Sequence, residues 1–103
     1  MRTFPKSLAK FRDIVDERGQ RLRGVPFEEL KHFDGPSEQF EFDGRSSRIS
    51  IIVQPQPSGG IRVVVQGFMK AKVIGWDVAL HGFYKYPDET IAEMAHEEFY
   101  EFD

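Results

Sequence analysis

The first twenty-odd residues carry apolar side chains at helical spacing. Charged residues lie on the opposite side of this stretch, and the apolar positions are Leu8, Phe11, Ile14 and Val15, with Leu22 a looser continuation. Ser7 is a candidate cap at the start, and Gly19 is a candidate stop at the end. The pattern therefore predicts a first helix over about residues 7–18.

A second, shorter apolar stripe follows, formed by Phe27, Leu30 and Phe33. Pro26 suits the first turn of a helix, because its missing N–H is not needed there. Gly35 and Pro36 then interrupt the stripe. These features predict a second helix over about residues 26–33.

From residue 38 the apolar period changes to two. Phe40 and Phe42 alternate with polar residues, and Asp43-Gly44 is a strong signal for a tight turn. A further strand is expected from Arg48 to Gln54, so this region is predicted to be a β-hairpin.

The β-branched run from Ile61 to Phe68 predicts a third strand, after a loop rich in proline and glycine over residues 55–60. Val73 to Tyr86 predicts one long strand, or two pieces broken near residues 75–77. We therefore expect residues 1–103 to form one α+β domain. Two N-terminal helices would pack on an antiparallel sheet of four strands, or five, with a C-terminal hairpin or short helix.

The strand alternation gives this sheet two apolar faces. The face expected to pack on the first helix is formed by Ile49, Ile51, Val53, Ile61, Val63, Val65 and Met69. The opposite face still holds Ile52, Val64 and Phe68, joined by Phe83 or Tyr84 depending on the register. A solvent-facing strand surface is more polar than this, and monomers rarely leave large apolar patches bare. We expect the C-terminal segment, a second copy of the chain or a ligand to cover this second face.

The C-terminal segment, residues 87–103, is both acidic and aromatic. It holds seven carboxylates and no Lys or Arg, whereas residues 1–86 hold fourteen basic and ten acidic groups. Its large side chains are Met94, Phe99, Tyr100 and Phe102. A hairpin through about Met94 followed by a short helical turn competes with a helix capped by Thr90 and Glu93. We favour the hairpin, and the opposed charges favour docking of the segment on the basic N-terminal region.

Composition narrows the class of protein. The chain has 103 residues, of which 40% are hydrophobic and ten are Phe, as expected for a globular protein with an aromatic core. The lack of cysteine excludes disulfides, thiolate nucleophiles and zinc–sulfur sites, and makes the cytoplasm the expected compartment. We find no signal-peptide pattern and no apolar run of membrane-spanning length, so no membrane partner is expected.

Candidate catalytic and metal-binding residues are few. Glu93 and His96 have the spacing by which one helix shares a metal, but a carboxylate-bridged centre needs a second such motif, which the chain lacks. His81 would act as a general base if Asp77 aligned it, yet an extended strand holds the two far apart. There is no glycine-rich phosphate loop. We therefore predict no catalytic, cofactor-binding or metal-binding residue and favour a protein that is not an enzyme.

Two alternative functions stay open. A pocket near His81, with Tyr84 or Tyr86, would make the protein a small-molecule binder or a minor enzyme. The first 25 residues hold seven basic groups against three acidic ones, which would suit nucleic acid. The sequence pI of about 5.6 and the alternating charges of the first helix argue against nucleic acid.

The leading prediction is a small cytoplasmic protein-interaction module. It would associate with itself, or act as an immunity-like or antitoxin-like inhibitor through its acidic aromatic C-terminus. Trp76 stands beside a glycine near an expected strand break, where it would be either a core plug or an interface anchor. The candidate interaction residues are Trp76, His81, Phe68, Glu97, Glu98, Tyr100 and Glu101.

Overall fold

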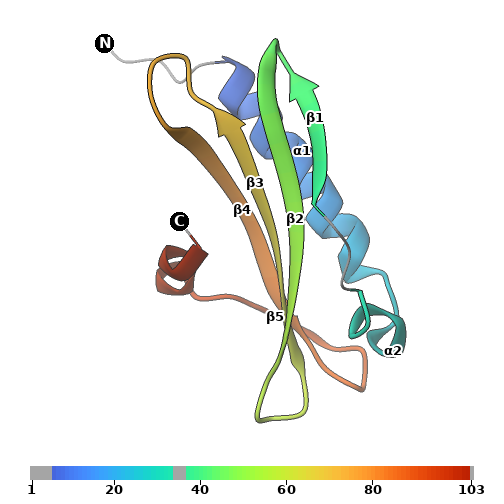
Figure 1. Ribbon diagram of the computed structural model, residues 1–103. Helices are drawn as coiled ribbons and strands as arrows, with labels where there is room; N and C mark the ends of the chain where they lie inside the picture. The colour runs from blue at the N-terminus through green and yellow to red at the C-terminus, as the bar shows by residue number, and fades with distance from the viewer. Residues whose placement is uncertain (1–5, 34–36, 103) are drawn as a thin grey trace.

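One antiparallel sheet organises the chain, with a long helix on one face and a C-terminal 3₁₀ helix on the other (Figure 1). The computed structural model describes residues 6–33 and 37–102. The helical elements are α1 (Lys6–Arg23), α2 (Phe27–Leu30) and η1 (His96–Phe102). The strands are β1 (Glu38–Phe42), β2 (Arg45–Pro55), β3 (Ile61–Lys70), β4 (Trp76–Lys85) and β5 (Ile91–Glu93). Each strand pairs with the next along the chain, so the predicted α+β class is confirmed and the sheet has five strands.

Helix α1 begins at Lys6, just before the predicted start, and ends at Arg23, well beyond the predicted end near residue 18. Gly19 is a buried residue inside the helix, because a side chain there would overlap the ring of His81 from β4. Ser7 lies within the first turn, and its hydroxyl oxygen accepts a hydrogen bond from Arg45 of β2. The predicted stop and cap were therefore wrong, and both residues instead connect the helix to the sheet.

Helix α2 is a single turn, shorter than the helix predicted over residues 26–33. Phe27 and Leu30 are buried in the main core, whereas Phe33 is 38% exposed. The predicted stop at Gly35-Pro36 lies outside the described residues. The second helix is therefore confirmed as an element, but its predicted length was wrong.

The turn between β1 and β2 is the one that the sequence predicts. Asp43 and Gly44 both have positive φ angles, 52° and 73°, as a two-residue turn of type I′ requires. The register that follows places Phe40 opposite Ser47. Phe40 and Phe42 thereby face α1, where both rings lie close to Phe11.

Strand β4 begins at Trp76, so the strand start predicted at Val73 was wrong. The preceding residues form a loop closed by a hydrogen bond from the Ala71 N–H to the Gly75 carbonyl oxygen, at 3.0 Å. Gly75 has φ 84°, a conformation that favours glycine. Val73 and Ile74 consequently lie at the end of the β3–β4 hairpin and not in the sheet.

The first face of the sheet carries α1 and the main core. Its fully buried members include Phe11, Val15, Val63, Val65, Met69 and Phe83. Lys85 of β4 is only 3% exposed, and its ammonium group donates hydrogen bonds to the carbonyl oxygens of Arg23 and Val25, both at 2.7 Å. This contact satisfies carbonyl groups at the C-terminal end of α1, where the helix has no partner of its own for them.

The second face carries a smaller core under η1. Val64, Met94 and Phe102 are its buried members, and the partly buried side chains around them are Ile52, Leu80, Tyr84 and Phe99. Register places Tyr84 on this face, since Phe83 lies opposite Val63 on the face that carries α1. The C-terminal segment thus forms the favoured hairpin followed by a helical turn, and it covers part of the second face, the first of the three covers that the sequence left open.

Candidate interaction surface

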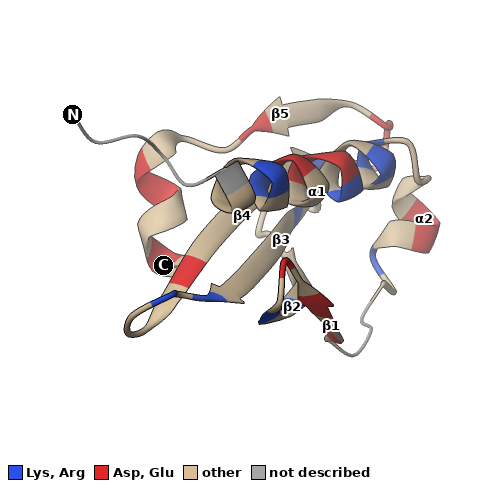
Figure 2. Ribbon diagram, turned by 90° about the horizontal axis from the view of Figure 1, so that it is seen from above, with Lys and Arg blue, Asp and Glu red and all other residues tan. Residues whose placement is uncertain are grey.

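The end of the β3–β4 hairpin exposes three large apolar side chains. We define the hairpin tip as residues 70–76, within which Val73 is 94%, Ile74 87% and Trp76 53% exposed. The tip carries two exposed lysines, Lys70 and Lys72, and no acidic residue. In Figure 2 this loop projects at the lower left with blue segments beside it. The tip is therefore apolar at its end and basic at its base.

Arg45 holds the base of this hairpin to the rest of the molecule. Its side chain is 12% exposed, and its guanidinium group donates a hydrogen bond to the Lys70 carbonyl oxygen at 3.4 Å. It also pairs with Asp77 at 3.8 Å and donates a hydrogen bond to Ser7 of α1. The base of the hairpin is thus anchored to β2 and α1, and the exposed apolar side chains lie beyond this anchor.

A hollow of about 670 Å³ lies beside the tip, on the half of the second face that η1 leaves uncovered. Trp76, Arg48 and Glu41 contribute to its lining. The Arg48 guanidinium carbon lies 5.0 Å from the centroid of the Phe68 ring, a cation–π distance. Of the predicted interaction residues, Trp76 and Phe68 therefore lie on one surface together.

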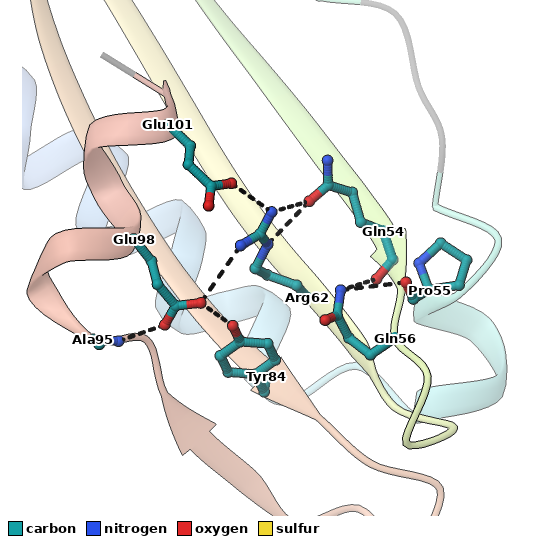
Figure 3. A network of polar contacts seen from close by, with 8 residues as sticks. All are labelled: Gln54, Pro55, Gln56, Arg62, Tyr84, Ala95, Glu98 and Glu101. Atoms are coloured by element: carbon teal, nitrogen blue, oxygen red, sulfur yellow. Dashed lines mark hydrogen bonds and ion pairs between the residues drawn. The ribbon is translucent and has the colours of Figure 1, made fainter.

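Arg62 of β3 holds η1 against the second face (Figure 3). Its guanidinium group donates to Gln54 at 3.0 and 2.6 Å, to Glu98 at 3.4 Å and to Glu101 at 3.0 Å. The same group lies 5.1 Å from the centroid of the Phe102 ring. Two of the predicted acidic interaction residues, Glu98 and Glu101, are thus engaged inside the chain.

The contacts of Glu98 stabilise its charged form. The Tyr84 hydroxyl donates a hydrogen bond to this carboxylate, and the Ala95 N–H donates a second one at 2.7 Å. These two hydrogen bonds, the first the larger effect, lower the pKa of Glu98 below its ordinary value. The Glu98 carboxylate in turn raises the pKa of Tyr84. The neighbouring Glu97 is exposed, as is Tyr100, which is 66% exposed.

His81 lies between α1 and the sheet, away from the hairpin tip. It is 9% exposed, and its ring nitrogens are 3.2 Å from an Asp16 carboxylate oxygen and 3.1 Å from the Arg23 Nε. Because the Arg23 N–H donates, the neutral ring with its proton on Nδ1 fits both contacts. Arg23 also forms an ion pair with Glu93, at 2.5 Å, and its hydrogen bond lowers the pKa of that carboxyl. Asp16 is the carboxylate beside His81, whereas Asp77 lies four residues away on the same strand, as the sequence indicated.

Three arginines of α1 are engaged in ion pairs. Arg18 pairs with Glu38, Arg21 with Glu17 at 2.5 Å, and Arg23 with Glu93. Figure 2 shows basic and acidic positions interleaved along this helix. The Arg23–Glu93 pair brings one carboxylate of the C-terminal segment to α1. Glu98 and Glu101 instead pair with Arg62 on the opposite face of the sheet, so η1 does not dock on the basic N-terminal region as the opposed charges predicted.

No group of three or more His, Asp or Glu side chains that would suit a metal ion occurs among residues 6–33 and 37–102. No helix in that part of the chain is both long and apolar enough to span a lipid bilayer.

Sequence reasoning did not single out Val73, Ile74 or Arg62. Val73 and Ile74 are β-branched and were placed in a strand, although the lysines before them and Gly75 after them are typical of a turn. Arg62 alternates with valines on β3, and only the tertiary structure shows that η1 lies over it.

Comparisons of this chain with models of protein families, with curated proteins and with solved structures find no match in any of the three. The function is therefore argued from the surface alone, since the fold class by itself implies no activity.

Proposed function

We propose that this protein is a non-enzymatic protein-interaction module whose contact surface is the hairpin tip together with the hollow beside it. The exposure of Val73, Ile74 and Trp76 at one end of an anchored hairpin is the observation that carries this proposal. Fully burying a Val or Ile side chain contributes about 1.5–3 kcal/mol. Val73, Ile74 and Trp76 stay in water in the isolated chain. Their burial by a partner would therefore contribute favourable free energy to binding.

The composition of this surface supports a protein partner. Interface hot spots are enriched in Trp and Arg and cluster around apolar anchors that exclude water. Trp76 and Arg48 line the same hollow, and Phe68 lies beneath Arg48. Trp76 is thus an interface anchor in this proposal and not a core plug.

The acidic C-terminal segment is a secondary contact at most. Glu98 and Glu101 already pair with Arg62, and Phe102 is 9% exposed. An inhibitor that bound a basic partner through this segment would have to use Glu97 and Tyr100, which remain exposed. We assign the protein to the cytoplasm from the sequence, since a chain without cysteine needs no oxidising compartment.

The test compares three immobilised proteins in quantitative affinity capture from cell extract: the wild type, a tip variant (Val73→Ser, Ile74→Ser and Trp76→Ser), and Phe33→Ser. Phe33 is an exposed apolar residue away from the tip. We expect one or more proteins, this chain included, whose capture falls at least about tenfold in the tip variant, equivalent to about 1.4 kcal/mol. Phe33→Ser should leave that capture unchanged. Equal capture by all three proteins, with folding verified by circular dichroism, would overturn the proposal.

A further inference from the structure

The hairpin tip holds positive charge that the rest of the described chain does not neutralise. Lys70 and Lys72 are both exposed, and within the described residues neither forms an ion pair with a carboxylate. Asp77, the acidic residue next to the tip, pairs with Arg45 at 3.8 Å. A partner that covers the apolar end of the tip would therefore bind better if it also carried unpaired carboxylates.

Helix η1 presents the opposite chemistry on its outer side. Among described residues outside the tip, no large apolar side chain is more exposed than Tyr100, at 66%. The His96 ring lies edge-on to the Tyr100 ring, with centroids 5.9 Å apart. Glu97, between them in the chain, is exposed and has no ion-pair partner in the part of the chain that the structure describes. Figure 2 shows acidic segments along this helix, which ends at the C-terminus. Helix η1 thus offers an aromatic surface with negative charge.

The tip and η1 do not cover one another within one chain. Figure 1 shows them apart, the tip at the end of the β3–β4 hairpin and η1 beside the sheet. Gln66 of β3 donates a hydrogen bond to the Phe102 carbonyl oxygen of η1 at 2.5 Å. Lys70, at the base of the tip, lies four residues further along that strand, about 13 Å away. Any contact that covers both surfaces therefore has to involve another molecule.

We infer that the hairpin tip of one copy of this chain docks on η1 of a second copy. The inference rests on the proposed function and names its partner. In this contact the apolar end of the tip packs against the rings of His96 and Tyr100, and Lys72 lies beside Glu97. The contact joins two different surfaces, so it is heterologous.

One such contact accounts for both exposed surfaces, which favours a second copy as the partner. Another protein bound at the tip would leave Tyr100 and Glu97 in water, and another protein bound at η1 would leave the tip in water. A second copy brings the basic apolar surface and the acidic aromatic one in equal numbers. The tip supplies most of the apolar area, and η1 adds a smaller, acidic share. Interfaces of this small size are weak and transient, so association is expected at high protein concentration.

The experiment uses the purified full chain in sedimentation equilibrium at concentrations up to about 1 mM. The mass of the wild type should rise above the 11.9 kDa of the monomer. The tip variant, and an η1 variant with Glu97→Lys and Tyr100→Ser, should each raise the dissociation constant at least about tenfold. The matched control is Glu29→Lys with Phe33→Ser, the same kinds of change at exposed positions away from both surfaces. It should associate like the wild type.

Mixing the two variants tests which surfaces meet. The tip variant keeps an intact η1, and the η1 variant keeps an intact tip, so one contact between them remains. The mixture should form a 1:1 complex at concentrations at which neither variant associates with itself. A contact of tip with tip, or of η1 with η1, would not be restored in this way.

A charge exchange tests the ion pair of the contact. Lys72→Glu should raise the dissociation constant about fivefold, which corresponds to the upper end of the range for an exposed pair. Glu97→Lys in the same chain should restore it, because the two charges are then exchanged and again opposite. Added salt should weaken association of the wild type. Failure of Glu97→Lys to restore association would overturn the pairing of Lys72 with Glu97.

A wild-type chain that stays monomeric up to about 1 mM would overturn this inference, and so would a mixture of the two folded variants that forms no complex. If the chain is monomeric while tip-dependent capture of another protein persists, the inference fails and the proposed function stands. If capture and self-association both ignore the tip substitutions, the proposed function fails as well. Circular dichroism verifies the fold of each variant.

Discussion

The ring of His81, on β4, lies against the backbone of Gly19, on α1, in space that a side chain at position 19 would occupy. In an exposed helix, replacing Gly by Ala contributes about 1 kcal/mol of stability. Here the added methyl group collides with a buried ring held by Asp16 and Arg23. We therefore expect Gly19→Ala to lower the free energy of unfolding by about 1–3 kcal/mol, the usual cost of overpacking. Urea denaturation measures this change.

The matched control for that substitution removes the ring. In a His81→Ala background, Gly19→Ala should cost much less or become stabilising, because the helix propensity of Ala is then unopposed. A stabilising effect of Gly19→Ala in the wild-type chain would contradict the close contact.

Lys85 provides a second test, of the connection between α1 and β4. Lys85→Met keeps the apolar stem but leaves the carbonyl oxygens of Arg23 and Val25 without their donor. Hydrogen bonds to a charged group contribute about 1.5–3 kcal/mol each, so we expect a loss of about 2 kcal/mol or more in the free energy of unfolding. Lys72→Met, at an exposed position, should change it by less than about 0.5 kcal/mol. Equal effects of the two substitutions would exclude the capping role.

The docking of η1 can be tested with two aromatic residues of the same helix. Phe102 is 9% exposed under Arg62, whereas Tyr100 is 66% exposed. Phe102→Ala should lower the free energy of unfolding by about 3 kcal/mol, as for other buried aromatic rings, and should increase the binding of an apolar dye. Tyr100→Ala, measured at a low protein concentration, should stay within about 0.5 kcal/mol of the wild type. Similar small effects of both would show that η1 does not pack on the sheet.

Acid should weaken the contact between η1 and the sheet through Glu98. Its pKa is below the ordinary value of 4.5 in the folded chain, chiefly through the Tyr84 hydroxyl. The unfolded chain therefore binds more protons in this range. The stability that Glu98 contributes is complete above about pH 4.5 and is lost as the pH falls through the lower folded value.

Glu98→Gln tests this pH dependence. We expect the variant to be less stable than the wild type by about 1 kcal/mol at pH 7, a typical value for a hydrogen-bonded surface pair. The difference should shrink as the pH falls below 4.5, the ordinary pKa of the group, and through the lower folded value. Glu97→Gln is the control, since Glu97 is exposed on the same helix. A difference between Glu98→Gln and the wild type that is constant with pH would rule out the role of the carboxylate. Thermal melting at several pH values measures it.

The periodic parts of the fold could be predicted from the sequence because their causes are local. Helical spacing located α1, a β-branched run located β3, and two residues able to adopt positive φ located the turn at Asp43-Gly44. The element ends were less predictable. A glycine often marks the end of a helix. Here the ring of His81, from a distant strand, requires a glycine at position 19 inside α1.

In the candidate surface, too, some residues could be recognised from local sequence, and others only from the tertiary structure. Trp76 could be singled out because it stands beside a glycine in the sequence. Phe68 could be singled out because strand alternation places it on the second face of the sheet. Val73 and Ile74 could not, since β-branched residues favour a strand unless the chain turns before reaching them. The turn at residues 71–75 depends on the pairing of β3 with β4, which is a property of the folded chain.

By itself, the sequence determined an α+β domain with two apolar sheet faces and an acidic aromatic C-terminal segment able to cover one of them. Only the tertiary structure decided how far that cover reaches, because β5 pairs with three residues of β4 before the chain turns away to η1. The uncovered remainder is the β4 edge beside an exposed hairpin tip. Strand edges and exposed tips are defined by which neighbours are missing, and a missing neighbour is a long-range property that no local pattern encodes.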